Sequence, residues 1–295
     1  MTSSSITLIC IVIAVFATQT NGFLFGGPNW NNLRVTFGNP VSSKSFVKMP
    51  RVVADTAAKG FHEDISARGC DATTNGFVGR RFVRTNGDRS IMLLFDDAGY
   101  IAGIQTTVPK SQNYPTLANK AVHNVWIEEA SSNTLTAYWT DPSRICNGGR
   151  TADEYKSQGT GDRLLIQVGR ATSNADVQFM TIPMKEKDVP TSTKWTKGKC
   201  FIMMGQHYWY NMRMNMNCNE FFPGFLLYNS GKLDGFGFAM ATNFEGQHFE
   251  HPTTAVTDKF FPFLPTCMTA PSFPQTFSTV HVYMYDKPWL KTCLF

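Results

Sequence analysis

Short apolar segments separated by turn signals recur through most of this chain, and they constrain its fold more than any other feature. Turns are indicated by Asn86-Gly87-Asp88 and by Asn229-Ser230-Gly231, whose residues accept a positive φ or bond to their own backbone. Segments joined by such turns are expected to pair as antiparallel neighbours. The strands expected from this pattern span residues 90–95, 100–108, 122–128, 134–138, 163–168, 177–182, 225–227, 233–240 and 280–285.

Helical signal is sparse, and two short helices are expected. Residues 151–157 follow a Gly-Gly turn, and Thr151 with Glu154 three residues later has the spacing of a capping box. Residues 254–261 form the other candidate. The sequence therefore predicts a mainly β fold, an antiparallel sandwich or a barrel-like arrangement, with one or two short helices.

The composition of the 295-residue chain indicates a folded protein with a large core. Hydrophobic residues make up 42% and aromatic residues 13%, whereas charged residues make up only 17%. Because no Pro-rich or Ser-rich linker interrupts it, the segment 23–295 is expected to form one β-rich domain. Two packed β-subdomains divided near residues 185–197 are the alternative. The formal charge of +5 is spread without a long run of Lys and Arg, which argues against a nucleic-acid partner.

The amino-terminal segment has the pattern of a secretory signal peptide. Residues 6–16 are almost entirely apolar, a stretch too short for a membrane span and typical of a signal h-region. Small residues up to Gly22 predict a signal peptide of residues 1–22 and a mature chain that begins near Phe23. Cleavage near Ala17 or Thr18 and an uncleaved anchor are the alternatives. We therefore expect a secreted, extracellular protein with no membrane span in its mature chain.

The number and spacing of the cysteines indicate disulfide bonds. Of the seven cysteines, Cys10 lies in the signal segment, and no pair has C-x-x-C spacing. Cys200 and Cys218 flank a short stretch that can fold back as a hairpin, so they are the predicted pair within the fifteen connectivities that six cysteines allow. Three disulfides are expected among Cys70, Cys146, Cys200, Cys218, Cys267 and Cys293.

Histidines and methionines gather in the last third of the chain. His207, His251 and His281 lie there, and three converging imidazoles would form the nitrogen ligand set of many zinc and copper sites. Three methionines at alternate positions would share one face of a strand, and their thioether sulfurs would favour copper; they are Met212, Met214 and Met216. The competing interpretation is that the methionines fill the core and that each histidine has a structural or surface role.

Carboxylate pairs offer a weaker pattern. Adjacent carboxylates in a strand point to opposite faces, so they are poor candidates for two groups that flank one bond, and we expect them at turns and rims. These pairs are Asp96-Asp97, Glu128-Glu129 and Asp153-Glu154. The G-x-S-x-G nucleophile motif is absent, and the absence of an N-x-S/T sequon predicts no N-glycan.

Four stretches of the sequence resemble a widespread set of secreted invertebrate proteins of unassigned activity. They are GYIAGIQTTVPK at 99–110, GTGDR at 159–163, FLLYN at 225–229 and STVHVY at 278–283. The resemblance extends over most of the mature chain and implies secretion and one large domain. It implies no catalytic or ligand-binding residue.

Two classes of function follow from these observations. One is a secreted, disulfide-stabilised binding or structural protein that contacts an extracellular ligand or protein through exposed Tyr208, Trp209 and Tyr210. The other is a secreted metal-dependent enzyme, an oxidoreductase that uses Cu or Zn bound by the histidines. The first is favoured because it needs only a folded β scaffold.

Overall fold

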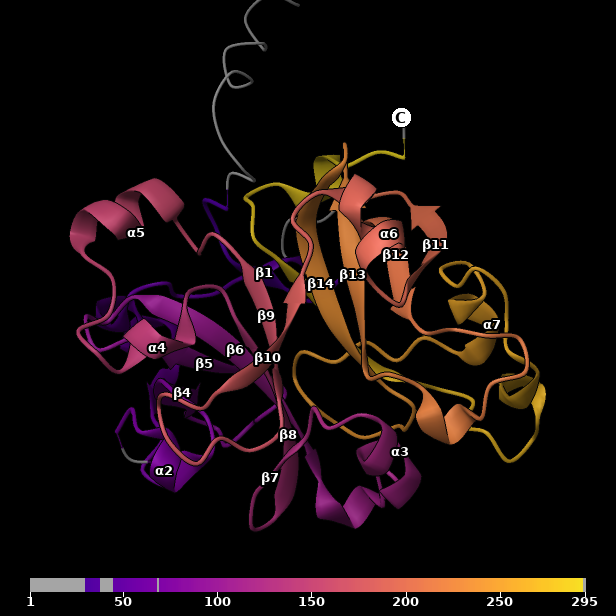
Figure 1. The fold of residues 1–295 in the computed structure, drawn as a ribbon, viewed down its shortest axis with the longest axis horizontal. Coiled ribbons are helices and arrows are strands. Elements are labelled where there is room, and N and C mark those ends of the chain that lie inside the picture. The colour runs from indigo at the N-terminus through magenta and orange to yellow at the C-terminus, as the bar shows by residue number, and fades with distance from the viewer. Residues whose placement is uncertain (1–29, 38–44, 68, 294–295) are drawn as a thin grey trace, which may run out of the picture.

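The computed structural model describes residues 30–37, 45–67 and 69–293, and these residues form two antiparallel β-sheets (Figure 1). The larger sheet has the strand order β10-β9-β8-β6-β5-β4-β3, with β7 paired to β8. Its strands are β3 (Phe61–Glu63), β4 (Arg80–Arg84), β5 (Met92–Phe95), β6 (Ile101–Pro109), β7 (Ile127–Glu128), β8 (Ser132–Tyr138), β9 (Leu164–Val168) and β10 (Gln178–Ile182). The expected signal peptide lies outside the described residues.

The second sheet has the strand order β11-β12-β13-β14-β15-β1-β2. Its strands are β1 (Arg34–Val35), β2 (Val47–Lys48), β11 (Trp195–Phe201), β12 (Gly205–Tyr210), β13 (Gly224–Asn229), β14 (Lys232–Met240) and β15 (Ser278–Tyr283). The expected mainly antiparallel β fold is therefore confirmed.

The hairpin between β13 and β14 shows how local chemistry sets the strand register. Ser230 and Gly231 form its two-residue loop, and both have positive φ, 48° and 73°. Two consecutive positive φ values give the loop a twist that matches the right-handed twist of the flanking strands. The turn predicted at this place is confirmed.

A single hydrophobic cluster joins the two sheets. It contains Leu93, Ile104 and Ile166 of the eight-stranded sheet together with Phe236 and Val282 of the seven-stranded sheet, all nearly or fully buried. The chain passes from the eight-stranded to the seven-stranded sheet between the end of β10 and the start of β11. This interval overlaps residues 185–197, the boundary of the alternative arrangement with two subdomains. However, β1 and β2 bring the first described residues into the second sheet, so each sheet contains segments distant in sequence.

Short helices lie at the edges of the sheets (Figure 1). They are α2 (Ala72–Asn75), α3 (Leu117–Val122), α4 (Pro142–Ile145), α5 (Ala152–Gln158), α6 (Val189–Ser192) and α7 (Thr254–Thr257). The 3₁₀ turns are η2 (Val53–Asp55), η3 (Ala57–Lys59), η4 (Lys110–Gln112), η5 (Glu186–Asp188), η6 (Cys218–Glu220), η7 (Thr266–Thr269) and η8 (Pro288–Leu290). None of the helices in the described part of the chain is long and apolar enough to cross a membrane.

The helix expected at 151–157 is confirmed as α5, and its capping box is complete. The Thr151 hydroxyl accepts from the Glu154 N–H, and the Glu154 carboxylate accepts from the Thr151 N–H. The helix expected at 254–261 is only the single turn of α7. The strand expected at 122–128 is wrong in its first half, because Val122 is the last residue of α3. Within this helix the Asn119 side-chain amide donates to the Phe221 carbonyl oxygen, a tertiary contact that the local sequence does not show.

Three disulfides form, as expected from the cysteine count. They join Cys70 to Cys146, Cys200 to Cys293 and Cys218 to Cys267, with Cα–Cα distances of 5.4, 5.9 and 5.7 Å. The predicted pairing of Cys200 with Cys218 is wrong. The hairpin of β11 and β12 turns earlier than expected and places Cys200 opposite Gln206, while Cys218 lies beyond the end of β12.

Candidate functional site

The histidines predicted to bind a metal lie in different surroundings. His207 on β12 and His281 on β15 are buried, and their ring centroids are 6.4 Å apart, with the Phe225 ring 5.6 and 4.9 Å from them. His251, in contrast, is exposed. Within the ranges that the structure describes, no three His, Cys, Asp or Glu side chains are arranged to hold a metal ion.

Hydrogen bonds and packing account for the two buried histidines. The His207 Nδ1–H donates to the Gly205 carbonyl oxygen at 3.1 Å. Burial, together with neighbouring His281, lowers the pKa of His207 to about 3, so its imidazole is neutral at physiological pH. His281 Nδ1 lies 3.3 Å from a Glu250 carboxylate oxygen, which also accepts from the Thr279 hydroxyl. These contacts fit the structural role that was the competing interpretation.

Two predictions are wrong: that Met212, Met214 and Met216 share one face of a strand, and that Tyr208, Trp209 and Tyr210 form an exposed aromatic surface. Residues 211–217 form turns rather than a strand, so Met212 and Met216 are buried whereas Met214 is 51% exposed. Tyr208 and Trp209 are buried, and Tyr210 is partly buried. The sequence shows the aromatic content of β12 but not that Tyr208 packs against Tyr228 and Trp209 against Phe261.

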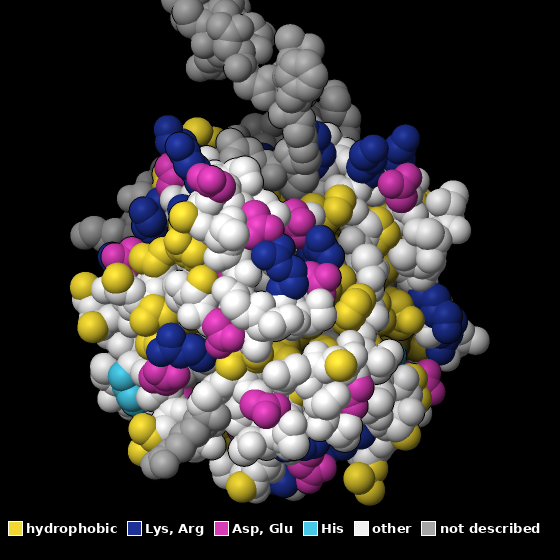
Figure 2. Space-filling model, turned by 60° about the vertical axis from the view of Figure 1, so that its left-hand side comes forward, with side chains coloured by type: hydrophobic (Ala, Val, Ile, Leu, Met, Phe, Trp, Pro, Cys, Tyr) yellow, Lys and Arg dark blue, Asp and Glu magenta, His cyan; other side chains and the backbone are white. Residues whose placement is uncertain are grey.

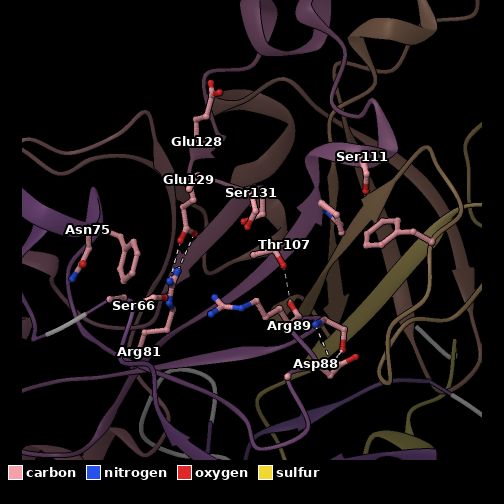
Figure 3. A pocket seen from close by; sticks show the side chains of 18 of the residues that line it. Ser66, Asn75, Arg81, Asp88, Arg89, Thr107, Ser111, Glu128, Glu129 and Ser131 are labelled. Atoms are coloured by element: carbon pink, nitrogen blue, oxygen red, sulfur yellow. Dashed lines mark hydrogen bonds and ion pairs between the residues drawn. The ribbon is translucent and has the colours of Figure 1, made fainter.

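A polar cleft lies on the eight-stranded sheet, and it is the best candidate site (Figure 3). Its volume is about 1170 Å³. Arg81 of β4 pairs in register with Leu94, which belongs to a second, smaller hydrophobic cluster, so the cleft opens on the face that carries that cluster. The wall residues labelled in Figure 3 are Ser66, Asn75, Arg81, Asp88, Arg89, Thr107, Ser111, Glu128, Glu129 and Ser131.

An ion-pair network around Arg81 organises the cleft. The Arg81 guanidinium donates two parallel bonds to Glu129, both 2.9 Å, and its Nε–H donates to Asp64 at 2.9 Å. Arg89 contacts the same Asp64 oxygen at 3.0 Å, and the Phe77 ring centroid lies 4.9 Å from the Arg81 Cζ. Arg81 is only 1% exposed, so its donors are directed by the protein rather than by water.

Glu128 and Glu129 of the cleft and the adjoining Asp64 have carboxyl pKa values below their ordinary values, so they are held in the ionised form. Burial opposes ionisation of Glu129, but the hydrogen bond and charge of Arg81 outweigh it and lower the Glu129 pKa. For Asp64 burial is likewise outweighed, by hydrogen bonds from Ser66 and by the charges of Arg81 and Arg89, so its pKa is lowered. These three carboxylates are therefore fixed charges rather than groups ready to give a proton.

Residues 244–250 form a wall that connects the two sheets across the cleft. On one side the Gln247 N–H donates to Asp88 at 2.7 Å, and the His248 N–H donates to the Ser90 hydroxyl at 3.2 Å. On the other side the Glu250 N–H donates to the Thr279 carbonyl of β15. Phe244 and Phe249 supply the apolar part of this wall.

The charges of the cleft and of its immediate ion-pair partners cancel. Glu128 at the rim pairs with Lys110 at 2.9 Å and with Lys120 at 3.4 Å. Five cationic groups face five acidic groups: Arg81, Arg89, Arg170, Lys110 and Lys120 against Asp64, Asp88, Glu128, Glu129 and Glu245. The face of the molecule in Figure 2 likewise shows Lys and Arg interspersed with Asp and Glu.

Sequence reasoning found only part of this site. Glu128 and Glu129 were expected at a turn or rim, and Glu128 is exposed at the rim whereas Glu129 is part of the cleft wall. β4, which carries Arg81, was not expected, because three of its five residues are arginine and hide the apolar alternation. An arginine among the apolar residues of a strand was the available signal, since such a charge must find a partner.

The chain matches no known protein family, no curated protein and no solved structure. The site must therefore be interpreted from its own geometry.

Proposed function

We propose that this protein is a secreted, disulfide-stabilised binding protein and that the polar cleft of the eight-stranded sheet is its ligand site. The observation that carries the proposal is the cleft itself: a hollow of about 1170 Å³ whose walls are held by paired, directed polar groups. Clefts of this size that present a few well-placed polar groups are the usual places for ligands.

The arrangement favours binding over general-acid catalysis by Asp64, Glu128 or Glu129. A general acid needs a carboxyl that stays protonated near neutral pH, whereas Asp64, Glu128 and Glu129 have lowered pKa values. Asp96 and Asp234, whose buried carboxyls have raised pKa values, do not line the cleft. A metal-dependent oxidoreductase lacks support as well, because in the described part of the chain no three His, Cys, Asp or Glu side chains are arranged to hold a metal ion.

Secretion is part of the proposal. Three disulfides are typical of proteins that fold in oxidising compartments, and the apolar segment at residues 6–16 has the length of a signal h-region. The resemblance to secreted invertebrate proteins implies the same location. Amino-terminal sequencing of protein from the culture medium should give a first residue near Phe23; a mature chain that retains residues 6–16 would contradict it.

A variant whose side chain fills the cleft tests whether the cleft is the ligand site. The exposed side chain of Ser131 lies on the cleft wall, so Ser131→Trp should block a ligand. Ser157→Trp on α5 is the matched control, the same change at an exposed position outside the cleft. The secreted protein and both variants are screened by ligand-observed NMR against oligosaccharides, amino acids, short peptides and amines. Binding that Ser131→Trp alone removes supports the proposal; binding that survives it, or none across all four classes, contradicts it.

A further inference from the structure

We propose that the ligand of the cleft is an uncharged oligosaccharide. This inference rests on the proposed function, since it names the class of molecule that the same cleft binds. Three properties of the cleft carry it: its charge balance, the hydrogen-bonding groups that remain free, and its size.

The charge balance favours an uncharged ligand. Each of the three Arg81 nitrogens donates to Asp64 or Glu129, and Glu128 pairs with two lysines at the rim. A ligand with a net charge would gain little Coulomb energy from a wall whose charges cancel, and it would still lose its own hydration. Such a wall attracts dipoles rather than ions.

The free hydrogen-bonding groups suit ligand hydroxyls. One terminal nitrogen of Arg89 pairs with Asp64, and the other makes only a 3.6 Å contact with the Met92 sulfur, which leaves donors of this partly exposed side chain unspent. Among the described residues, the Ser111 and Ser131 hydroxyls bond to no protein group. A sugar hydroxyl both donates and accepts, so it can bond to a guanidinium, a carboxylate and a serine together.

The cleft side chains that would bond to the ligand are already held in place by other protein groups. The Asp88 carboxylate accepts from the N–H groups of Ser90 and Gln247, and Arg89 is restrained by Asp64, so neither must be ordered when a ligand arrives. Binding therefore loses little side-chain entropy. The aromatic rings of the cleft are nearly buried, Phe77 at 1% and Phe249 at 9% exposure, so hydrogen bonds rather than ring stacking are expected to dominate the affinity.

The size of the cleft favours an oligomer over a single sugar. Its volume of about 1170 Å³ exceeds the range of roughly 300–1000 Å³ that is usual for one drug-sized ligand. Several sugar rings can therefore contact the wall at once, which compensates for the modest energy of each hydroxyl bond.

The test uses the secreted full chain and isothermal titration calorimetry. The uncharged probes are cellohexaose, maltohexaose, laminarihexaose and N-acetylchitohexaose; the charged probes are hexagalacturonate and the chitosan hexamer. At least one uncharged hexamer should bind, with a Kd that changes by less than about twofold between low and high salt, because no net charge is screened. Arg89→Ala should weaken that binding about tenfold or more, as expected for hydrogen bonds to a charged group. Arg163→Ala, which alters an exposed arginine paired with Asp162 outside the cleft, should not.

Three outcomes would overturn the proposal of an uncharged oligosaccharide, and two of them leave the proposed ligand site open. If Arg89→Ala misfolds by circular dichroism, Ser131→Trp replaces it, and binding that neither variant weakens overturns the inference. Charged hexamers that bind in a salt-dependent manner and are displaced by Ser131→Trp overturn the uncharged class but leave the cleft as a ligand site. Failure of all uncharged hexamers also overturns the inference, while amino acids, peptides or amines that bind in the cleft would preserve the proposed function.

Discussion

At the scale of single residues, this structure depends on charges and imidazoles that are buried with a partner. Arg81 has three hydrogen bonds to two carboxylates and an aromatic ring against its guanidinium. His248 accepts from an Arg84 Nη2–H at 2.7 Å through its Nε2. Such groups are tolerated inside a protein because their partners replace water, so removing a partner leaves the remaining group desolvated.

Arg81→Met should destabilise the protein strongly. The substitution keeps an apolar stem but leaves Asp64 and Glu129 without their main counter-charge, and breaking a buried pair costs about 3–5 kcal/mol. Guanidinium unfolding with the disulfides intact measures the change. Arg163→Met, whose ion pair with Asp162 is exposed, should cost less than about 1 kcal/mol. Equal effects of the two substitutions would show that the network adds no stability.

Acid should weaken the protein through His248. Burial first, and then the charge of Arg84, lower the pKa of His248 to about 4, below its ordinary value of 6.5. Between these values the unfolded chain binds the proton more readily, so stability falls as pH decreases from about 6.5 to about 4, by roughly 1.4 kcal/mol per pH unit for this group. Above about 6.5 the group has no effect.

The histidine assignment is checked by the slope of unfolding free energy against pH. His248→Gln keeps an acceptor for Arg84 without a titrating group, so it should reduce the slope between pH 4 and 6.5. His251→Gln, at an exposed position, is the control and should leave the slope as it is. A slope unaffected by His248→Gln would assign the acid sensitivity elsewhere, with buried His207 the next candidate.

At the scale of elements, loops and disulfides fasten the outer layers to the two sheets. The disulfide of Cys200 and Cys293 holds the end of the described chain to β11, and Cys218 with Cys267 joins η6 to η7. Residues 244–250 donate hydrogen bonds to Asp88 beside the eight-stranded sheet and to Thr279 of the seven-stranded sheet. The shape of the site is therefore set by segments between strands as much as by strands.

Digestion without reduction should release three linked peptide pairs that join Cys70 with Cys146, Cys200 with Cys293 and Cys218 with Cys267. Mass spectrometry identifies them, and a peptide that links Cys200 to Cys218 would contradict the structure. Replacing Cys218 and Cys267 together by Ala should lower the free energy of unfolding by about 2–4 kcal/mol, because the unfolded chain loses a constraint. As a control, the variant and the unchanged protein are compared after reduction of all disulfides, where we expect the double substitution to cause no loss in the free energy of unfolding.

At the scale of the whole molecule, two sheets share one core, and the candidate site opens on an outer face of one of them. The last third of the chain contributes mostly packing: His207, Tyr208 and Trp209 are buried beneath loops. The polar groups available to a ligand lie mainly in the first half, on β4, β6 and the segments around β7. The first half of the sequence therefore supplies most of the polar groups of the cleft, and residues 244–249 of the second half add the apolar part of its wall.

The placement of the histidines predicts the metal content of the protein. Since no three His, Cys, Asp or Glu side chains among the described residues are arranged to hold a metal ion, protein purified without chelator should contain far less than one equivalent of Cu or Zn. Elemental analysis decides the matter. Stoichiometric metal that is lost in His207→Ala but retained in His62→Ala would restore the metal-dependent enzyme as the leading hypothesis.

The sequence by itself determined the features whose causes are local. The β class follows from alternation and turn residues, the turn at Asn229-Ser230-Gly231 from residues that accept a positive φ, and α5 from the spacing of its capping box. The number of disulfides followed from counting cysteines outside the apolar amino-terminal segment. Each of these depends on residues within a few positions of one another, or on composition.

Only the tertiary structure decided which distant residues meet. Arg81 reaches Asp64 across 17 residues and Glu129 across 48, and Cys200 finds its partner 93 residues away. Those contacts depend on the order in which strands pair and on which loops cover them, and the period of a strand pattern carries no information about either. For the same reason Tyr208 and Trp209 were expected on the surface and lie buried: alternation shows that a strand has two faces, but the layers packed against it determine which faces meet solvent.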